Sequence, residues 1–277
     1  MNSMLSKALL QALDTGAAAE AETVGFFGRI VQTFQQWWQD LSHEFYRNFI
    51  YENRWEWLFE GLGNTLLITF FAVLLGIVIG IVVAAVRSTY DKNSETLKRQ
   101  GGLGWFLLRF FNGICNLYLT VFRGTPIVVQ LLIMYFVVFA TTDNDILVAI
   151  LAFGINSGAY VAEIFRGGIL SIDNGQFEAG RALGFNYVQT MIYIITPQMF
   201  KTVLPTLCNE FIVLLKETSV AGYVAIMDLT KAGDLIRGRT FSAFMPLLAV
   251  ALIYLVIVII LTKLVGLLER RLRKNER

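Results

Sequence analysis

An unbroken apolar run from Leu66 to Val86 constrains the fold of this chain more than any other feature. It holds about 20 residues without a charge, which is the length that a helix needs to cross the hydrocarbon core of a bilayer once. Gly76 and Gly80 form a GxxxG pair in it, which can let another helix approach closely. The whole chain of 277 residues is 56% hydrophobic, with a mean hydropathy of +0.59. Since soluble globular domains are less apolar, the sequence predicts a membrane protein.

Further apolar segments predict an all-α integral membrane protein with about five transmembrane helices. The stretch from Trp105 to Ala140 is too long for one straight crossing and is interrupted by Arg109 and Arg123. We expect its first part to lie in or near the membrane interface. The remaining crossings are expected at about Ile127 to Phe139, Ile146 to Phe165, Val203 to Met227 and Phe244 to Leu267.

Charge clusters predict the orientation of these helices. A basic cluster follows the first crossing, and a basic tail follows Leu268. Because positive charge beside a crossing favours the cytoplasmic side, the N-terminus is expected outside and the C-terminus in the cytoplasm. Residues 230–240, expected as a polar outer loop, run against this rule with Lys231, Arg237 and Arg239. The clusters are Arg87, Lys92, Lys98 and Arg99, and then Arg270, Arg271, Arg273, Lys274 and Arg277.

The first residues form a separate part of the chain, because 1–56 contain no crossing. Val24 to Trp38 is expected to be amphipathic, and Trp37, Trp38, Trp55 and Trp57 suit a membrane interface. A helix packed on the outer face of the domain is the other interpretation. We therefore expect an extracytoplasmic or interfacial extension over 1–56, a transmembrane domain over 57–272 and a basic tail over 273–277.

A polar island, residues 173–197, lies between the apolar segments. Asp173 begins a turn and a short helix, expected from about Gln176 to Leu183. Gly184 can end this helix in the left-handed conformation that other residues resist. Asn186 can cap a second helical piece, which we expect Pro197 to end.

This island resembles the EAA loop of the membrane subunits of binding-protein-dependent ABC importers. The residues that carry the resemblance are Glu178, Ala179, Gly180, Gly184, Ile194 and Pro197. Their spacing fits the family pattern throughout, while Gly180 replaces a usual Ala and Thr196 a usual Leu. In that family the loop docks on a separate ATPase subunit, and the resemblance implies the same coupling here.

Other motifs resemble the branch of this family that imports polar amino acids of the histidine, glutamine, glutamate or arginine type. Arg123, Gly124, Thr125 and Pro126, followed by IVVQ, resemble its RGTPLLVQ signature. The alternative is an ordinary arginine that reaches the interface before a helix start, with Pro126 in the first turn. The segments GAYVAEIFRGGI and Lys216 to Val220 point to the same branch.

The resemblance implies a fold of the type I ABC importer permease kind and a set of partners. These are ABC ATPase subunits, a second permease subunit, an extracytoplasmic solute-binding protein, a polar amino acid and membrane lipid, but no nucleic acid. The chain has no GxxxxGK[ST] phosphate loop, so ATP and Mg²⁺ are expected on the partner ATPase, with no cofactor on this chain. No catalytic set or metal-ligand spacing is present, so we expect neither an enzyme nor a metal site; Cys115 and Cys208 are expected to be buried and inert and His43 exposed.

Polar residues within the predicted crossings are candidates for the substrate path. Asn156, Tyr160 and Glu163 recur at spacings of four and three and share one helix face. Arg166 follows Glu163 by three residues and can pair with it. Glu210, Lys216 and Glu217 lie in the predicted fourth crossing. Each of these side chains has an alternative role, namely an ion pair or hydrogen bond that holds helices together.

Two other functions remain open from the sequence. An ATP-independent channel or ion-coupled carrier fits the intramembrane charges and the missing phosphate loop, although no inverted repeat supports it. A membrane-embedded enzyme lacks a catalytic constellation. An ATPase that copurifies with the chain separates the importer from both.

Overall fold

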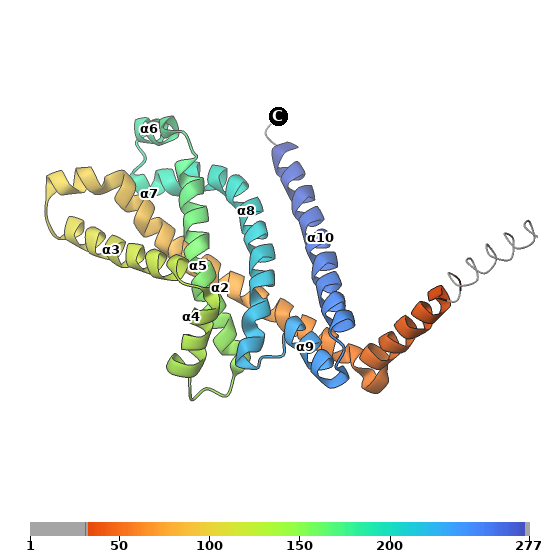
Figure 1. Cartoon of the computed structure of the whole chain (residues 1–277). Helices are drawn as coiled ribbons and strands as arrows, with labels where there is room; N and C mark the ends of the chain where they lie inside the picture. The colour runs from red at the N-terminus through yellow and green to blue at the C-terminus, as the bar shows by residue number, and fades with distance from the viewer. Residues whose placement is uncertain (1–30, 32, 275–277) are drawn as a thin grey trace, which may run out of the picture.

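The computed structural model describes residues 31 and 33–274, and all the regular elements in this part are helical (Figure 1). The predicted amphipathic segment 24–38 and the basic tail therefore lie partly outside the described residues. Within the bundle, α6 and the end of α10 lie at one end, called the α6 end, and α9 lies at the other, called the α9 end (Figure 1). A helix over 33–45 comes first; the elements that follow are η1 (Tyr46–Ile50), η2 (Tyr51–Asn53), α2 (Trp55–Gln100), α3 (Leu103–Gly124), α4 (Ile127–Ile133), η3 (Met134–Val138), α5 (Asp145–Leu170), α6 (Asn174–Ala182), α7 (Tyr187–Thr190), η4 (Met191–Ile195), α8 (Thr196–Glu217), η5 (Thr218–Val224), α9 (Leu229–Thr240) and α10 (Phe244–Lys274).

The predicted first crossing lies within α2, which runs obliquely across the bundle and packs mainly on α5 (Figure 1). The GxxxG prediction is confirmed, and the partner is α5. A Cβ on Gly80 would lie 2.5 Å from Val161 Cγ1, and one on Gly76 would lie 3.0 Å from Ser157 Oγ. Because a larger residue at either position would push the helices apart, these glycines set the α2–α5 distance. Around this contact lies a core that includes Ile68 and Phe153.

Four helices of the described part are long and apolar enough to cross a membrane: Trp55–Glu95 of α2, α3, α5, and Phe244–Leu272 of α10. The segment predicted for the second crossing does not form a helix of full crossing length. Its apolar helix, Ile127–Val138, measures only about 18 Å, too short to cross alone. The preceding α3 has the required length and composition, and its arginines are accommodated: Arg109 lies over the Trp105 ring at 5.2 Å, and Arg123 pairs with Glu163.

The predicted fourth crossing begins and ends earlier than expected. It forms α8, which begins at Thr196 and gives way at Thr218 to the 3₁₀ helix η5. Residues 230–240, expected as a loop, form the helix α9 instead, capped by the buried Asp228. This helix buries Leu229, Ile236 and other residues against α2 and α10. The apolar residues of α9 recur with helical spacing. The number of charged residues in the same segment favours a loop when this spacing is not considered.

The predicted burial of Cys115 and Cys208 is wrong, because both free thiols are only half-buried. Cys208 lines an apolar groove of 360 Å³ between α2, α8 and α10. His43 is exposed, as predicted. Two of the basic residues that run against the charge rule have side-chain partners: Arg237 Nε donates to Asp234 Oδ1 at 2.9 Å, and Arg239 lies over the Trp57 ring at 5.0 Å.

Candidate functional site

The 173–197 loop forms the expected helix, glycine and helix. Asp173 Oδ1 accepts a hydrogen bond from the Gly175 N–H at 2.7 Å and caps α6. At the other end Gly184 has a φ of +82°, and the Phe185 N–H donates to the Gly180 carbonyl at 3.0 Å. The Gly184 N–H also donates to the Arg181 carbonyl at 2.9 Å, which completes a Schellman motif. The left-handed role predicted for Gly184 is confirmed.

The second piece of the loop begins as predicted but does not end at Pro197. Asn186 and Gln189 form a capping box, with side chain to backbone bonds of 2.9 Å in both directions. Instead of stopping, α7 continues through η4 into α8, and Pro197 lies in the first turn of α8. Proline is tolerated there, because the π-helical turn of η4 precedes it and the first N–H groups of a helix need no partner within it.

The departure from the family pattern at Gly180 has a physical reason in this fold. Gly180 is buried where α6 crosses α7, and a Cβ there would lie 2.7 Å from both side-chain branches of Thr190. The two helices therefore approach more closely than an alanine would permit. Ile194 lies against the same spot, with its Cδ1 at 3.2 Å. The loop is consequently a packed unit rather than an open excursion of the chain.

Contacts with α2 and α8 fix this unit on the bundle. Lys92 Nζ donates to Asn174 Oδ1 at 2.6 Å and lies 4.6 Å from the centre of the buried Phe177 ring. Gln198 Nε2 donates to Gln176 Oε1 at 3.3 Å. Tyr187 is half-buried beside α6, and burial raises the pKa of its hydroxyl.

Within the described part of the chain, the outer side of α6 is exposed. Glu178, Ala179 and Ala182 are exposed, as are Arg181 and Leu183 beyond them. Leu183 keeps 70% of its surface accessible at the tip of the loop, next to Gly184. A rigid helix that presents acidic, basic and apolar side chains in this way has the features of a protein contact surface.

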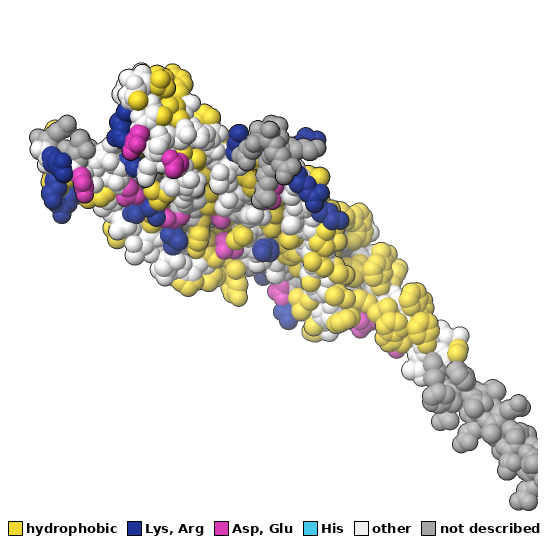
Figure 2. Space-filling view, turned by 90° about the horizontal axis from the view of Figure 1, so that it is seen from above, with side chains coloured by type: hydrophobic (Ala, Val, Ile, Leu, Met, Phe, Trp, Pro, Cys, Tyr) yellow, Lys and Arg dark blue, Asp and Glu magenta, His cyan; other side chains and the backbone are white. Residues whose placement is uncertain are grey.

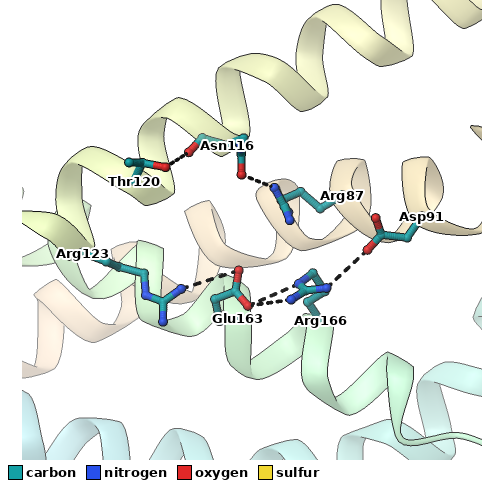
Figure 3. A network of polar contacts seen from close by, with 7 residues as sticks. All are labelled: Arg87, Asp91, Asn116, Thr120, Arg123, Glu163 and Arg166. Carbon is teal, nitrogen blue, oxygen red and sulfur yellow. Dashed lines mark hydrogen bonds and ion pairs between the residues drawn. The ribbon is translucent and has the colours of Figure 1, made fainter.

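Close to the loop, ion pairs join three helices (Figure 3). Glu163 on α5 is their centre: its Oε2 accepts from Arg166 Nη2 at 3.0 Å, and its Oε1 lies 3.8 Å from Arg123 Nη1. Arg166 reaches on to Asp91 of α2 at 3.3 Å. We call Asp91, Arg166, Glu163 and Arg123 the ion-pair chain. The predicted pairing of Glu163 with Arg166 is confirmed.

From the sequence, Arg87 is predicted only as part of a basic cluster, and no role is assigned to Asp91. Arg87 Nη1 donates to Asn116 Oδ1 of α3 at 2.7 Å, beside the ion-pair chain (Figure 3). Arg87 and Asp91 lie four residues apart and so share a face of the continuing helix. That spacing was the available signal, and it required the first helix to extend beyond Val86. The structure shows that α2 ends only at Gln100.

The RGTP motif builds a corner between α3 and α4. Gly124 ends α3, and Pro126 stands directly before α4 rather than in its first turn. Thr125 Oγ1 accepts from Gln130 Nε2 at 2.7 Å, and the same nitrogen donates to the Phe122 carbonyl at 2.9 Å. Arg123 points to α5, where it also lies 5.7 Å from the Tyr160 ring centre.

The three candidates on α5 do not behave alike. Asn156 is 3% exposed, and its Nδ2 donates to Gln130 Oε1 at 2.8 Å and to the Phe122 carbonyl at 3.0 Å. These bonds hold the corner between α3 and α4 to α5. They agree with the alternative role of Asn156, a hydrogen bond that holds helices together. Tyr160 remains 37% exposed and Glu163 half-buried, so both keep an accessible surface.

The candidates on α8, Glu210, Lys216 and Glu217, lie in the C-terminal part of that helix. Glu210 accepts from Ser157 Oγ of α5 at 3.1 Å. Lys216 is exposed, and Glu217 is half-buried at the last position of α8. Ser157 is completely buried, so its bond to Glu210 fixes the contact between α5 and α8.

The chain matches a protein family described as "Binding-protein-dependent transport system inner membrane component" over residues 102–274. It is 35% identical to the arginine transport system permease protein ArtQ of Bacillus subtilis (strain 168), over 79% of this chain and 94% of that protein. It is 36% identical to the glutamine transport system permease protein GlnP of Escherichia coli (strain K12), over 78% of this chain and 93% of that protein.

Solved structures agree with these relatives. A crystal structure of an amino acid ABC transporter with histidines is 36% identical, with a TM-score of 0.67 over 78% of this chain and 94% of that one. An inward-facing structure of the MetNI methionine ABC transporter is 20% identical, with a TM-score of 0.65 over 78% and 95% of the two chains, and shares the fold.

The fold and the 173–197 loop thus define a membrane-embedded transport subunit. The chain belongs to the family of inner membrane components of binding-protein-dependent transport systems and is a multi-pass membrane protein. The resemblance predicted from its loop is confirmed.

Proposed function

We propose that this chain is the permease subunit of an ATP-driven importer for a polar amino acid. The observation that carries the proposal is the rigid helix–glycine–helix loop at the α6 end, with its exposed outer side. The amino acid specificity rests on two relatives, whose names refer to arginine and glutamine transport, and on a similar solved structure, which is an amino acid ABC transporter with histidines. A separate ATPase, which binds ATP and Mg²⁺, docks on this loop and supplies the hydrolysis.

The α6 end faces the cytoplasm in this proposal. Basic residues at the end of α2, the 173–197 loop and the end of α10 gather there, and excess positive charge beside crossings favours that side. The chain then passes the membrane about five times, through α2, α3 with α4, α5, α8 and α10. The N-terminus lies outside and the C-terminus inside.

Cysteine labelling tests this orientation. With Cys115 and Cys208 replaced by Ser, a single cysteine at Ser94 should react only from the cytoplasmic side, and one at Thr142 only from outside. A cysteine at Asn275, outside the described residues, should behave like Ser94. Labelling of Ser94 from outside in intact cells would overturn the proposed topology.

The ATPase contact is proposed to centre on Glu178, Ala179, Ala182 and Leu183. A displacement of α6 by the ATPase is transmitted to the bundle by two connections. The backbone links α6 directly to α5, and the hydrogen bond of Lys92 to Asn174 links α6 to α2. Because α2 and α5 meet through Gly76 and Gly80, they follow the displacement together. The hydrogen bonds of the buried Asn156 to Gln130 and to the Phe122 carbonyl carry the motion of α5 on to the corner between α3 and α4.

The substrate path is proposed to involve Tyr160 and Glu163 on α5 and Glu210, Lys216 and Glu217 on α8. Carboxylates can meet the ammonium of an amino acid, and Lys216 its carboxylate. A second permease subunit completes the path on the other side. Asn156 has its hydrogen bonds satisfied by the corner, so we assign it to the framework.

The α9 end is proposed to receive the extracytoplasmic solute-binding protein. It carries a polar hollow of 490 Å³ between η5, α9 and the start of α10. Tyr223, Lys231 and Asp234 are among its lining residues. Such a hollow lies on the side where a substrate has to be handed over.

Reconstitution with the cognate ATPase and binding protein tests the whole proposal. We expect the ATPase to copurify with the chain and uptake of a polar amino acid to require ATP. Uptake that persists without ATP and without the ATPase would support the channel or ion-coupled carrier instead. Copurification without uptake of any polar amino acid would refute the substrate class but not the ATPase contact.

A further inference from the structure

The helix that precedes α2 is strongly amphipathic. At about 100° per residue, Phe34, Trp37, Trp38, Leu41 and Phe45 fall within an arc of about 100°, while glutamines and charged residues occupy the other side. The four aromatic members of this arc are all more than half exposed, with accessible fractions of 51% to 60%. The described part of the protein leaves this aromatic face uncovered.

A fixed corner joins this helix to α2. Glu52 and Asn53 both have positive φ values, 57° and 51°, which non-glycine residues rarely adopt. The buried Arg54 holds the turn, because its Nη1 donates to the Arg47 carbonyl at 2.7 Å and its Nη2 to Glu52 Oε2 at 2.9 Å. The arginine thus caps the end of the preceding helix and sets the direction in which it leaves the bundle.

The same face is covered at one end and open at the other. Leu41 and Phe49 pack into the cluster formed by α2, α9 and α10. Toward the N-terminus the face continues past the bundle, where Figure 2 shows hydrophobic side chains on the segment that projects at the lower right, before the grey residues. The uncovered face is therefore continuous with the packed core at the α9 end.

We propose that this helix lies in the membrane interface at the α9 end, with Phe34, Trp37, Trp38 and Phe45 among the lipids. The first turns of α2 show the level of the interface, because exposed Trp55 and Phe59 stack edge to face at 5.7 Å on a helix that spans the membrane. Tryptophan concentrates at this level, since its ring is apolar and its N–H needs a polar partner.

The charge of the opposite face indicates which lipid suits the helix. It carries Asp40 and Glu44 against Arg47, and otherwise mainly glutamine, serine and histidine. Anionic headgroups attract helices rich in lysine and arginine, which this face is not. The helix therefore fits a zwitterionic surface, and the apolar face provides the binding.

Spin labels test the proposal on the full chain in phosphatidylcholine vesicles. Single cysteines replace Phe34, Trp38, Gln36 or His43, after Cys115 and Cys208 are changed to Ser. Labels at Phe34 and Trp38 should be severalfold more accessible to O₂, which dissolves in lipid, than to a water-soluble nickel complex. Labels at Gln36 and His43, on the opposite face, should show the reverse. Anionic lipid should not change this pattern.

Two results would overturn the proposal. Equal access of the nickel complex at all four positions would place the helix in water. Shielding of Phe34 and Trp38 from both reagents would indicate a protein that covers the face. A second measurement uses unlabelled protein: in the variant W55F/W57F/W105F, whose remaining tryptophans are Trp37 and Trp38, acyl-brominated phosphatidylcholine should quench the fluorescence. Absence of quenching would also refute lipid contact.

Discussion

Gly184 offers a direct test of whether the 173–197 loop transmits force. Its φ of +82° lies in the left-handed region, while a built Cβ meets no heavy atom within 4 Å. Replacement by alanine therefore introduces backbone strain without a steric clash. The strain amounts to about 1–2 kcal/mol, and a β-branched residue such as valine should suffer more.

This energy corresponds to a roughly 5- to 30-fold lower population of the left-handed conformation at residue 184, in which α6 and α7 pack together. Gly184→Ala should lower either the uptake per ATP hydrolysed or the amount of copurified ATPase. Gly184→Val should lower the same quantity further. Gly184→Asn should retain most of the function, because asparagine tolerates the left-handed conformation. Insertion into the membrane should be unchanged in all three, since the loop lies outside the predicted crossings.

The assay is ATP hydrolysis and uptake, measured side by side in reconstituted vesicles with the ATPase quantified. Gly113→Ala and Gly113→Val are matched controls, because Gly113 is exposed on α3 and a Cβ there also meets nothing within 4 Å. If the variants with alanine and valine at Gly184 behave like wild type, the 173–197 loop is not a coupling element. If asparagine fails as badly as valine, the effect does not come from the sign of φ.

Other predictions concern the contacts around the loop. Lys92→Met keeps a chain against Phe177 but loses the hydrogen bond to Asn174, worth about 1 kcal/mol; we expect a severalfold lower ratio of uptake to ATP hydrolysis, which wild-type coupling would contradict. Gly180→Ala should lower ATPase copurification through its clash with Thr190, and Thr190→Ala should restore it; failure of this rescue would refute the packing argument. Glu163→Gln should reduce transport in a flux assay more than assembly in a copurification assay, whereas loss of insertion would favour a purely helix-pairing role.

The 173–197 loop was the part most readily predicted from the sequence. Its conformation is encoded by neighbouring residues: Asp173 and Asn186 act as helix caps, and Gly184 is the residue type that adopts a positive φ most easily. The prediction that Pro197 ends a helix is wrong, because a proline in the first turn of a new helix and one after the end of an old helix look the same in sequence. Only the continuation of α7 through η4 into α8 distinguishes them.

Features that depend on distant contacts were predicted less well. Arg123 argues against a crossing in α3, and its partner Glu163 follows only 40 residues later in the chain. Likewise α9 was read as a loop because its charges are conspicuous, while the burial of Leu229 and Ile236 depends on α2 and α10. The sequence shows that a charged residue lies in an apolar segment, where it is energetically unfavourable. It does not show which distant residue stabilises that charge.

The polar groups on α5 differ in how firmly they hold their neighbours. Asn156 and Gln130 are buried, so removal of either would leave an unpaired group at a cost of about 1–3 kcal/mol. The side chains of the ion-pair chain keep 25% to 44% of their surface exposed, and pairs of this kind contribute roughly 0–1 kcal/mol. A motion imposed on α6 should therefore carry α2, α5 and the RGTP corner as one body. Within that body the ion-pair chain is the part that can exchange partners, including a charged substrate, at low cost.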